Sequence, residues 1–138
     1  MITPVKISVM VHLTPKQVRL INGLHFATVA TVMPDGSPEA TVVWIETDGK
    51  YIFFNTAMHR LKARNLQRNP RVAITIVDPA QPYRDTLAVR GQAELVMDGA
   101  DAHIEKLSRA YTGKPFRKLG ANEVRVIVKV TPELVHVQ

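Results

Sequence analysis

Runs in which β-branched and other apolar residues recur over short distances dominate this chain and predict strands. They cover residues 26–33, 39–46, 51–55, 71–77, 86–96 and 123–137, and β-branched side chains favour extended backbone. The turn sequences Pro34-Asp35-Gly36-Ser37 and Thr47-Asp48-Gly49-Lys50 separate the first three runs, and Asp-Gly pairs are typical of hairpin turns. We therefore expect these three strands to form a meander of antiparallel hairpins.

A helix signal follows an extended stretch at residues 3–12. Thr14 is placed as an N-cap, Pro15 at the first helical position and Gln17 three residues after the cap, which is the pattern of a capping box. The helix should end near residues 22–23. Its expected contacts with the rest of the fold are made by Val18, Ile21 and Leu24.

Two further helices are expected. Residues 59–69 place Leu61 and Leu66 where they can face inward, and Pro70 ends the segment. Asp98 or Gly99 then caps a helix over residues 100–111. Between these helices, Gly91 lies inside a long strand, where glycine indicates a bulge or bend.

Six strands with short turns and a few helices predict a mainly β (α+β) fold, a six-stranded antiparallel β-barrel. Closure of a sheet into a barrel removes the exposed edges that promote aggregation. With 138 residues, 46% of them hydrophobic and 22% charged, the chain fits one globular domain, 1–138.

Composition excludes several kinds of chemistry. The chain has no Cys, so disulfides, zinc–cysteine sites, iron–sulfur clusters and thiol nucleophiles are ruled out. Its five His residues lack metal-ligand spacing, and there is no Walker, dinucleotide or Gly-x-Ser-x-Gly motif. Any difficult chemistry would have to come from a bound cofactor. No leader sequence or membrane-length apolar run is present, so we expect a cytoplasmic chain with no membrane contact.

Positive charge gathers in one segment. Lys and Arg number 18 against 12 Asp and Glu, which favours an anionic partner. Residues 60–71 hold five cations and no acid: Arg60, Lys62, Arg64, Arg68 and Arg71. Spacing alone fits a solvated helix face equally well. However, Asn55-Thr56-Ala57-Met58 precedes the segment where a strand gives way to a helix. Free backbone N–H groups, the helix dipole, Arg60 and Lys62 would there converge on one phosphate.

Two aromatic positions have open interpretations. Trp44, the only Trp, fits a core or interface position better than a ligand platform. Tyr83 and Arg84 end a proline-rich loop, residues 78–83, and such a pair can clamp a planar anion or simply cover one end of the barrel.

Over residues 13–130 the chain resembles the pyridoxamine 5'-phosphate oxidase-like family of split β-barrels, and within it the class that uses the deazaflavin coenzyme F420. The resemblance rests on four strings: Phe26-Ala27-Thr28-Val29-Ala30-Thr31 with Pro34-Asp35-Gly36-Ser37-Pro38, Phe54-Asn55-Thr56 leading to Lys62-Ala63-Arg64-Asn65-Leu66, Asn69-Pro70-Arg71-Val72, and Val89-Arg90-Gly91.

This resemblance implies a homodimer with cofactor sites at the subunit interface. It implies that the cofactor ring lies along the second strand and that the phosphate lies at the start of the short helix. By the same resemblance, Lys62 matches the phosphate-binding Lys of the motif, and Arg60 is the additional basic residue of the deazaflavin class. The expected cofactor-binding residues are Thr41, Val42, Val43, Trp44, Asn55, Thr56, Ala57, Arg60, Leu61, Lys62, Tyr83 and Arg84. No catalytic residue is assigned.

The choice of F420 over flavin mononucleotide (FMN) depends on departures from the FMN oxidases. Leu61 stands where those enzymes carry an Arg, residues 40–45 include no basic side chain, and the C-terminal Arg/His substrate signature is missing. The resemblance thus implies an F420-dependent reductase that transfers a hydride to or from a conjugated small molecule. The alternatives are an FMN oxidoreductase of the same fold and a non-catalytic binding protein. Nucleic-acid binding is disfavoured because the aromatic residues lack interleaved basic ones.

Overall fold

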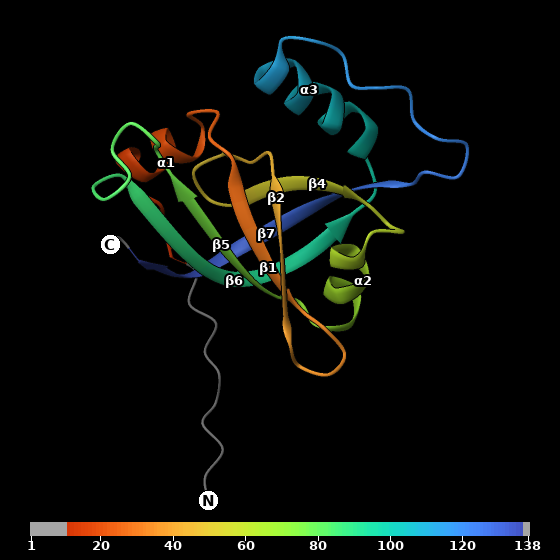
Figure 1. Ribbon diagram of the computed structural model, residues 1–138, viewed down its shortest axis with the longest axis horizontal. Helices are drawn as coiled ribbons and strands as arrows, with labels where there is room; N and C mark the ends of the chain where they lie inside the picture. The colour runs from red at the N-terminus through yellow and green to blue at the C-terminus, as the bar shows by residue number, and fades with distance from the viewer. Residues whose placement is uncertain (1–10, 137–138) are drawn as a thin grey trace, which may run out of the picture.

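The computed structural model describes residues 11–136, which form an α+β fold of three helices and an antiparallel sheet (Figure 1). Most of the predicted extended stretch at residues 3–12 lies outside the described residues. Val137, the last residue of the predicted strand 123–137, also lies outside them. The elements are α1 (Pro15–Ile21), β1 (Ala27–Val32), β2 (Pro38–Val43), β3 (Glu46–Thr47), β4 (Ile52–Ala57), α2 (Leu61–Arg68), β5 (Arg71–Val77), β6 (Thr86–Val96), α3 (Ala100–Thr112) and β7 (Arg125–His136).

The sheet has seven strands in this part of the chain, not the six predicted, in the order β2-β1-β5-β6-β7-β4-β3. Although β2 and β3 lie at opposite edges of this order, only Trp44 and Ile45 separate them in the chain. Two residues span at most about 10 Å, so the sheet must curl until its edges approach each other there. The result is a curled half-barrel.

The predicted continuous strand at residues 39–46 was wrong, and so was the meander. The chain leaves β2 after Val43 and enters β3 at Glu46, which pairs with β4, whereas among the described strands β2 pairs with β1 alone. Two hairpins form as expected, β1 with β2 and β3 with β4. They are not hydrogen-bonded to each other through β2 and β3, which lie at opposite edges of the sheet order. The apolar run hides this break because Val43, Ile45 and Thr47 stay buried on both sides of it.

The core lies inside the curl. Alternate residues of the strands, among them Val29, Ile74, Val89 and Val128, are almost fully buried, as the period of two in a half-buried strand predicts. The register of β6 against β7 shifts between Arg90 and Gly91, where β7 has one residue more than β6. A methyl group at Gly91 would meet the Thr131 carbonyl oxygen at 2.2 Å, so this close approach requires glycine.

Helix α1 begins as predicted. Thr14 accepts from the Gln17 N–H, and the Gln17 side chain accepts from the Thr14 N–H at 2.9 Å. Ile21 is fully buried, but Leu24 is 51% exposed and does not serve as a packing contact. Leu24 lies beyond the helix at a positive φ of 62°.

Helices α2 and α3 lie where the sequence predicts them. In α2, Leu66 is buried as expected, whereas Leu61 is 43% exposed. Arg68 is not simply hydrated, because its Nη2 donates to the Val32 carbonyl at 2.6 Å and ties the helix to β1. Helix α3 begins after Gly99, whose φ of 78° suits glycine. None of the helices in the described part of the chain is long and apolar enough to cross a membrane.

Candidate functional site

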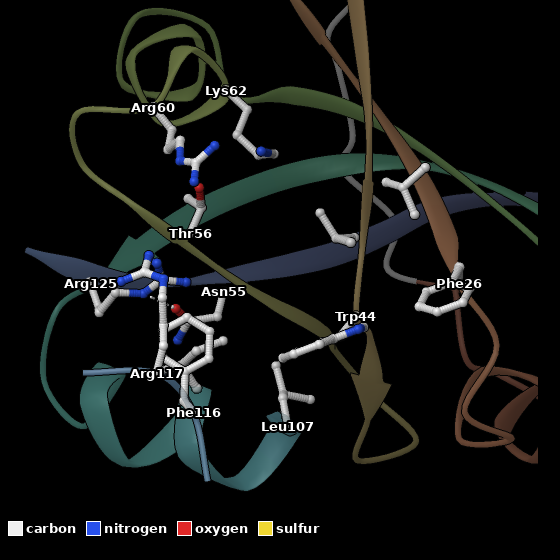
Figure 2. A pocket seen from close by; sticks show the side chains of 13 residues that line it. Phe26, Trp44, Asn55, Thr56, Arg60, Lys62, Leu107, Phe116, Arg117 and Arg125 are labelled. Atoms are coloured by element: carbon white, nitrogen blue, oxygen red, sulfur yellow. Dashed lines mark hydrogen bonds between the residues drawn. The ribbon is translucent and has the colours of Figure 1, made fainter. Parts of the chain in front are cut away.

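A cavity of about 420 Å³ opens beside the curled sheet (Figure 2). Its walls come from β2 and β4, the start of α2, helix α3 and the loop that leads to β7. A volume of this size falls in the range of small-molecule sites. The lining residues are Phe26, Val42, Val43, Trp44, Asn55, Thr56, Arg60, Lys62, Ile104, Leu107, Phe116, Arg117 and Arg125.

One end of the cavity is cationic. Among the described residues that line it, four carry positive charge and none carries a carboxylate. Arg60 and Lys62 stand at the start of α2, and Figure 2 shows them across the cavity from Arg117 and Arg125. The start of α2 adds backbone N–H groups without helical partners. This end therefore attracts anions.

The cations weaken one another's charged states. Burial and then repulsion from Arg60 lower the pKa of Lys62, an effect that Glu39 partly offsets and Arg125 strengthens. Burial is also the main cause that lowers the pKa of Arg125; Glu123 opposes this shift, and repulsion from Arg117 and Arg60 adds to it. A bound anion would relieve this repulsion, so the charge pattern fits an anionic ligand.

Glu123 neutralises part of this charge from outside the cavity wall. Its carboxylate, with a side chain only 7% exposed, accepts two hydrogen bonds from Arg117, at 2.8 and 3.0 Å, and one from Arg125 at 2.9 Å. The hydrogen bonds from Arg117 are the main cause that holds the pKa of Glu123 far below its usual value. One carboxylate cannot balance four cations, and the excess stays positive.

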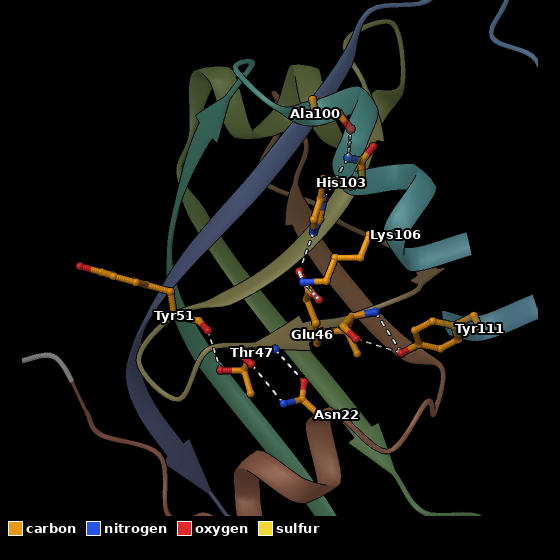
Figure 3. Close-up of polar contacts among 10 residues, drawn as sticks. Asn22, Glu46, Thr47, Tyr51, Ala100, His103, Lys106 and Tyr111 are labelled. Carbon is orange, nitrogen blue, oxygen red and sulfur yellow. Dashed lines mark hydrogen bonds and ion pairs between the residues drawn. The ribbon is translucent and has the colours of Figure 1, made fainter. Parts of the chain in front are cut away.

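The other end of the cavity is aromatic. Trp44 is half-buried and stacks on Tyr111 with ring centroids 5.5 Å apart, and Phe116 meets it edge-on at 6.4 Å. The Tyr111 hydroxyl accepts from the Ile45 N–H at 3.1 Å and lies within donating distance of the His25 and Ile45 carbonyls. Figure 3 shows this anchoring of Tyr111 beside β3. The linker between β2 and β3 is thus fixed by α3.

Seven of the twelve expected binding residues meet at this cavity: Val42, Val43, Trp44, Asn55, Thr56, Arg60 and Lys62. Three others, Thr41, Ala57 and Leu61, adjoin them in the chain without lining it. Tyr83 is 94% exposed, and Arg84 lies in a separate groove beside α1, next to Asp85 and Lys16. Their expected role across a dimer interface stays a prediction, because it needs a second chain.

Six lining residues have no counterpart in the sequence prediction: Phe26, Ile104, Leu107, Phe116, Arg117 and Arg125. Arg125 carried a detectable signal, since it interrupts an apolar run, Val124 to Val128, with a charge that must find a partner once buried. The segment Lys114-Pro115-Phe116-Arg117-Lys118 places an aromatic ring among cations. No pattern in the sequence around Arg125 or around residues 114–118 shows that these segments line the same cavity as Lys62. In residues 11–136 no cluster of His, Asp and Glu is placed to hold a metal ion.

A curled antiparallel half-barrel with a cationic cavity at the start of a short helix defines a class, the split β-barrels. The family model for pyridoxamine 5'-phosphate oxidase matches residues 13–138. The chain therefore belongs to the pyridoxamine 5'-phosphate oxidase-like family, as its sequence strings predict.

Solved structures agree with this assignment. An F420 reductase shares 35% identity at a TM-score of 0.79, over 91% of this chain and all of that one. A conserved hypothetical protein from Mycobacterium tuberculosis shares 26% identity at a TM-score of 0.72, over 96% and 88%. A putative pyridoxamine 5'-phosphate oxidase from Listeria innocua, at 22% identity and a TM-score of 0.67 over 85% and 91%, shares the fold. Curated proteins give no match. Fold and family suggest a flavin- or deazaflavin-binding oxidoreductase.

Proposed function

We propose that this protein is a coenzyme F420-dependent reductase that transfers a hydride between the deazaflavin and a conjugated small molecule. The observation that carries the proposal is the division of one cavity into a cationic end, with Arg60 and Lys62, and an aromatic end, with Trp44. F420 has the same division, because a phosphate and an acidic tail are joined to a flat ring. The similarity to a protein named F420 reductase supports the deazaflavin over FMN.

The residues present fit such a cofactor. Lys62 and Arg60 would bind the phosphate, where mutual repulsion is relieved by an anion. The β2 segment that ends in Val42 and Val43 and the Trp44 side chain would line the ring. The cofactor supplies hydride chemistry when bound, since no side chain here accepts or donates a hydride.

The chain's own contribution is to bind, orient and exclude water. Leu107, Ile104 and Phe116 form apolar walls, which reduce the water near a bound ring and strengthen the charge interactions at the cationic end. Tyr111 holds Trp44 by stacking and holds the Ile45 backbone by hydrogen bonds. No general acid is assigned, and a proton can come from water.

We further propose that the protein is a homodimer in which the second chain completes the cavity. Tyr83 projects almost fully exposed from the loop between β5 and β6, and this loop lies beside α1, apart from the cavity of its own chain. An exposed Tyr beside an Arg suits contact with a partner's planar ligand.

Cofactor titration tests the proposed function. Trp44 is the only Trp in the chain and lines the cavity, so its fluorescence reports binding there. We expect a colourless purified protein whose Trp44 emission is quenched by F420, with weaker binding of FMN. Reduced F420 should then be oxidised in the presence of an enone or a quinone. A protein that is yellow as purified and prefers FMN would establish the alternative cofactor. Tight F420 binding without turnover of any acceptor would indicate a binding protein.

A further inference from the structure

A series of buried and part-buried hydrogen bonds runs from the cavity along α3 to Glu46 of β3. The Arg125 Nε donates to the Asn55 Oδ1 at 2.9 Å. The Asn55 Nδ2 lies 2.9 Å from the Ala100 carbonyl and 3.0 Å from the His103 Nδ1. The His103 Nε2 lies 3.1 Å from the Glu46 Oε1. Arg125 and Asn55 line the cavity, whereas His103 and Glu46 do not.

The donors and acceptors in this series of hydrogen bonds fit together in one way. An amide nitrogen only donates, so the His103 Nδ1 accepts from Asn55, and the ring proton lies on Nε2 and points to Glu46. Both Asn55 N–H groups are then occupied, by Ala100 and by His103. With the amide turned over, its nitrogen would face the Arg125 Nε, which is also a donor. The Ala100 carbonyl and His103 together hold Asn55 in the orientation in which its Oδ1 can accept from Arg125.

Arg125 is held on two edges and covered on one face. Its Nε is bound by Asn55 and its Nη1 by Glu123, and the Phe116 ring lies 5.2 Å from its guanidinium carbon. A guanidinium has five N–H donors, and the described residues occupy two of those of Arg125. The side chain as a whole is 7% exposed, yet it lines the cavity (Figure 2). The remaining donors suit an anion that enters there.

We infer that Arg125 is an anion-binding residue of this cavity and that Asn55, His103 and Glu46 are positioning residues which hold its guanidinium in the binding orientation. Figure 3 shows His103 above Glu46, with Lys106 reaching the same carboxylate from α3. Asn55, expected to contact the ligand, acts through Arg125 because its own N–H groups are already used. The inference relies on the proposed function only in that the ligand carries an anionic group.

Calorimetric titration with F420 and, separately, with inorganic pyrophosphate tests the inference. Arg125→Lys keeps the charge but loses the planar donor pair, and it should weaken both ligands about tenfold. His103→Phe keeps a ring that cannot hydrogen-bond, and it should weaken both by about three- to tenfold. His103→Gln should bind within about twofold of the unsubstituted protein, because its Oε1 can accept from Asn55 and its Nε2 can donate to Glu46.

Combination and control variants separate positioning from general disruption. If His103 acts through Arg125, the double variant Arg125→Lys/His103→Phe should bind no more than about twofold more weakly than Arg125→Lys alone. Arg109 lies on α3, as His103 does, and its exposed side chain pairs with Glu105. Arg109→Ala should leave the affinity within about twofold of the unsubstituted protein. Thermal melting of each variant checks folding. If His103→Phe does not fold, Glu46→Ala removes the outer partner in its place.

Three results would overturn the inference: unchanged affinity in Arg125→Lys, unchanged affinity in a folded His103→Phe, or losses that add fully in the double variant. Its failure is distinguishable from failure of the proposed function. If neither F420 nor FMN binds but pyrophosphate does, with the expected dependence on Arg125 and His103, the inference stands and the function fails. If F420 binds equally well to every variant and its reduced form is oxidised by an acceptor, the function stands and the inference fails.

Discussion

Lys62 and Arg60 differ from the other cations of α2 because they line the cavity, while Arg64 is exposed and Arg68 binds the Val32 carbonyl. Four residues that look alike in the sequence thus have three environments. The side chain of Lys62 is only half-buried, so its ammonium reaches the cavity while its stem packs on the protein. Charge alone does not distinguish these positions, but their environment does.

Lys62→Ala should weaken F420 binding by about 10- to 150-fold, because a charged hydrogen bond to phosphate contributes about 1.5 to 3 kcal/mol. Arg60→Ala should have a similar or smaller effect. Fluorescence titration through Trp44 provides the measurement.

Arg64→Ala is the matched control for these two variants. It removes the same charge from the same helix, but from an exposed position outside the cavity, and should change only the salt-dependent part of the affinity. Arg68→Ala is unsuitable because it also breaks the bond to Val32. Equal losses in all three variants, Lys62→Ala, Arg60→Ala and Arg64→Ala, would mean a diffuse electrostatic attraction without a defined phosphate site.

Glu123 should make stability depend on acid pH. Hydrogen bonds from Arg117 and Arg125 lower its folded-state pKa below the usual 4.5, so the ionised form is stabilised by folding. The contribution to the free energy of unfolding is complete above about pH 4.5 and is lost as the pH falls toward the lowered value. Glu123→Gln should therefore destabilise the protein at pH 7 and have a smaller effect near pH 3. Urea unfolding at both values measures this, and an equal effect at both would contradict the assignment.

At the scale of elements, α1 shows how a helix with few residues is held in place. Its ends are fixed by the capping box at Thr14 and by Asn22, whose side chain pairs with the Thr47 backbone at 2.9 and 3.1 Å. Figure 3 shows Asn22 directly beneath Thr47. Helices shorter than about 12 residues are marginal by themselves, so burial of Ile21 and this link to β3 must supply the stability.

Ile21→Ala should lower the free energy of unfolding by about 2 to 4 kcal/mol, because the side chain is fully buried in the core cluster. Leu20→Ala should cost less, since Leu20 is only partly buried against that cluster. Leu24→Ala, at a 51% exposed position, should change the stability by less than about 0.5 kcal/mol. Chemical denaturation of the three variants gives the order, and equal effects would mean that α1 is packed differently.

At the scale of the whole molecule, the net charge of +6 and the cationic cavity act in the same direction. Long-range attraction raises the local concentration of an anionic ligand, and the cluster at Arg60, Lys62, Arg117 and Arg125 then binds it. The exposed Tyr83 and the groove around Arg84 lie apart from this cavity. One chain therefore presents both a site and a separate surface that a second chain can use.

The protein should be a dimer at micromolar concentration, and Tyr83→Ala should weaken cofactor binding without changing the fold. The physical reason is that Tyr83 is too exposed to stabilise its own chain and would reach a ligand only across a two-fold axis. Sedimentation velocity gives the mass, and circular dichroism checks the fold. A monomer at this concentration would contradict both the assembly and the expected role of Tyr83.

The sequence by itself determined most of the elements. The capping box at Thr14, the stop at Pro70 and the hairpin turn at Gly36 are local signals, because they depend on backbone conformations that a few neighbouring residues set. The basic start of α2 is also visible in the local sequence, and this segment together with the family resemblance named seven of the cavity residues.

Only the tertiary structure decided how the curl closes and what completes the cavity. The break after Val43 exists because two residues must cross between opposite edges of one sheet, which no local preference encodes. Arg125 reaches the cavity through pairing of β7 with β4, and His103 meets Asn55 across 48 positions of sequence. Contacts of that separation depend on how sheet and helices pack together, whereas periodicity reports only which face of each element is buried.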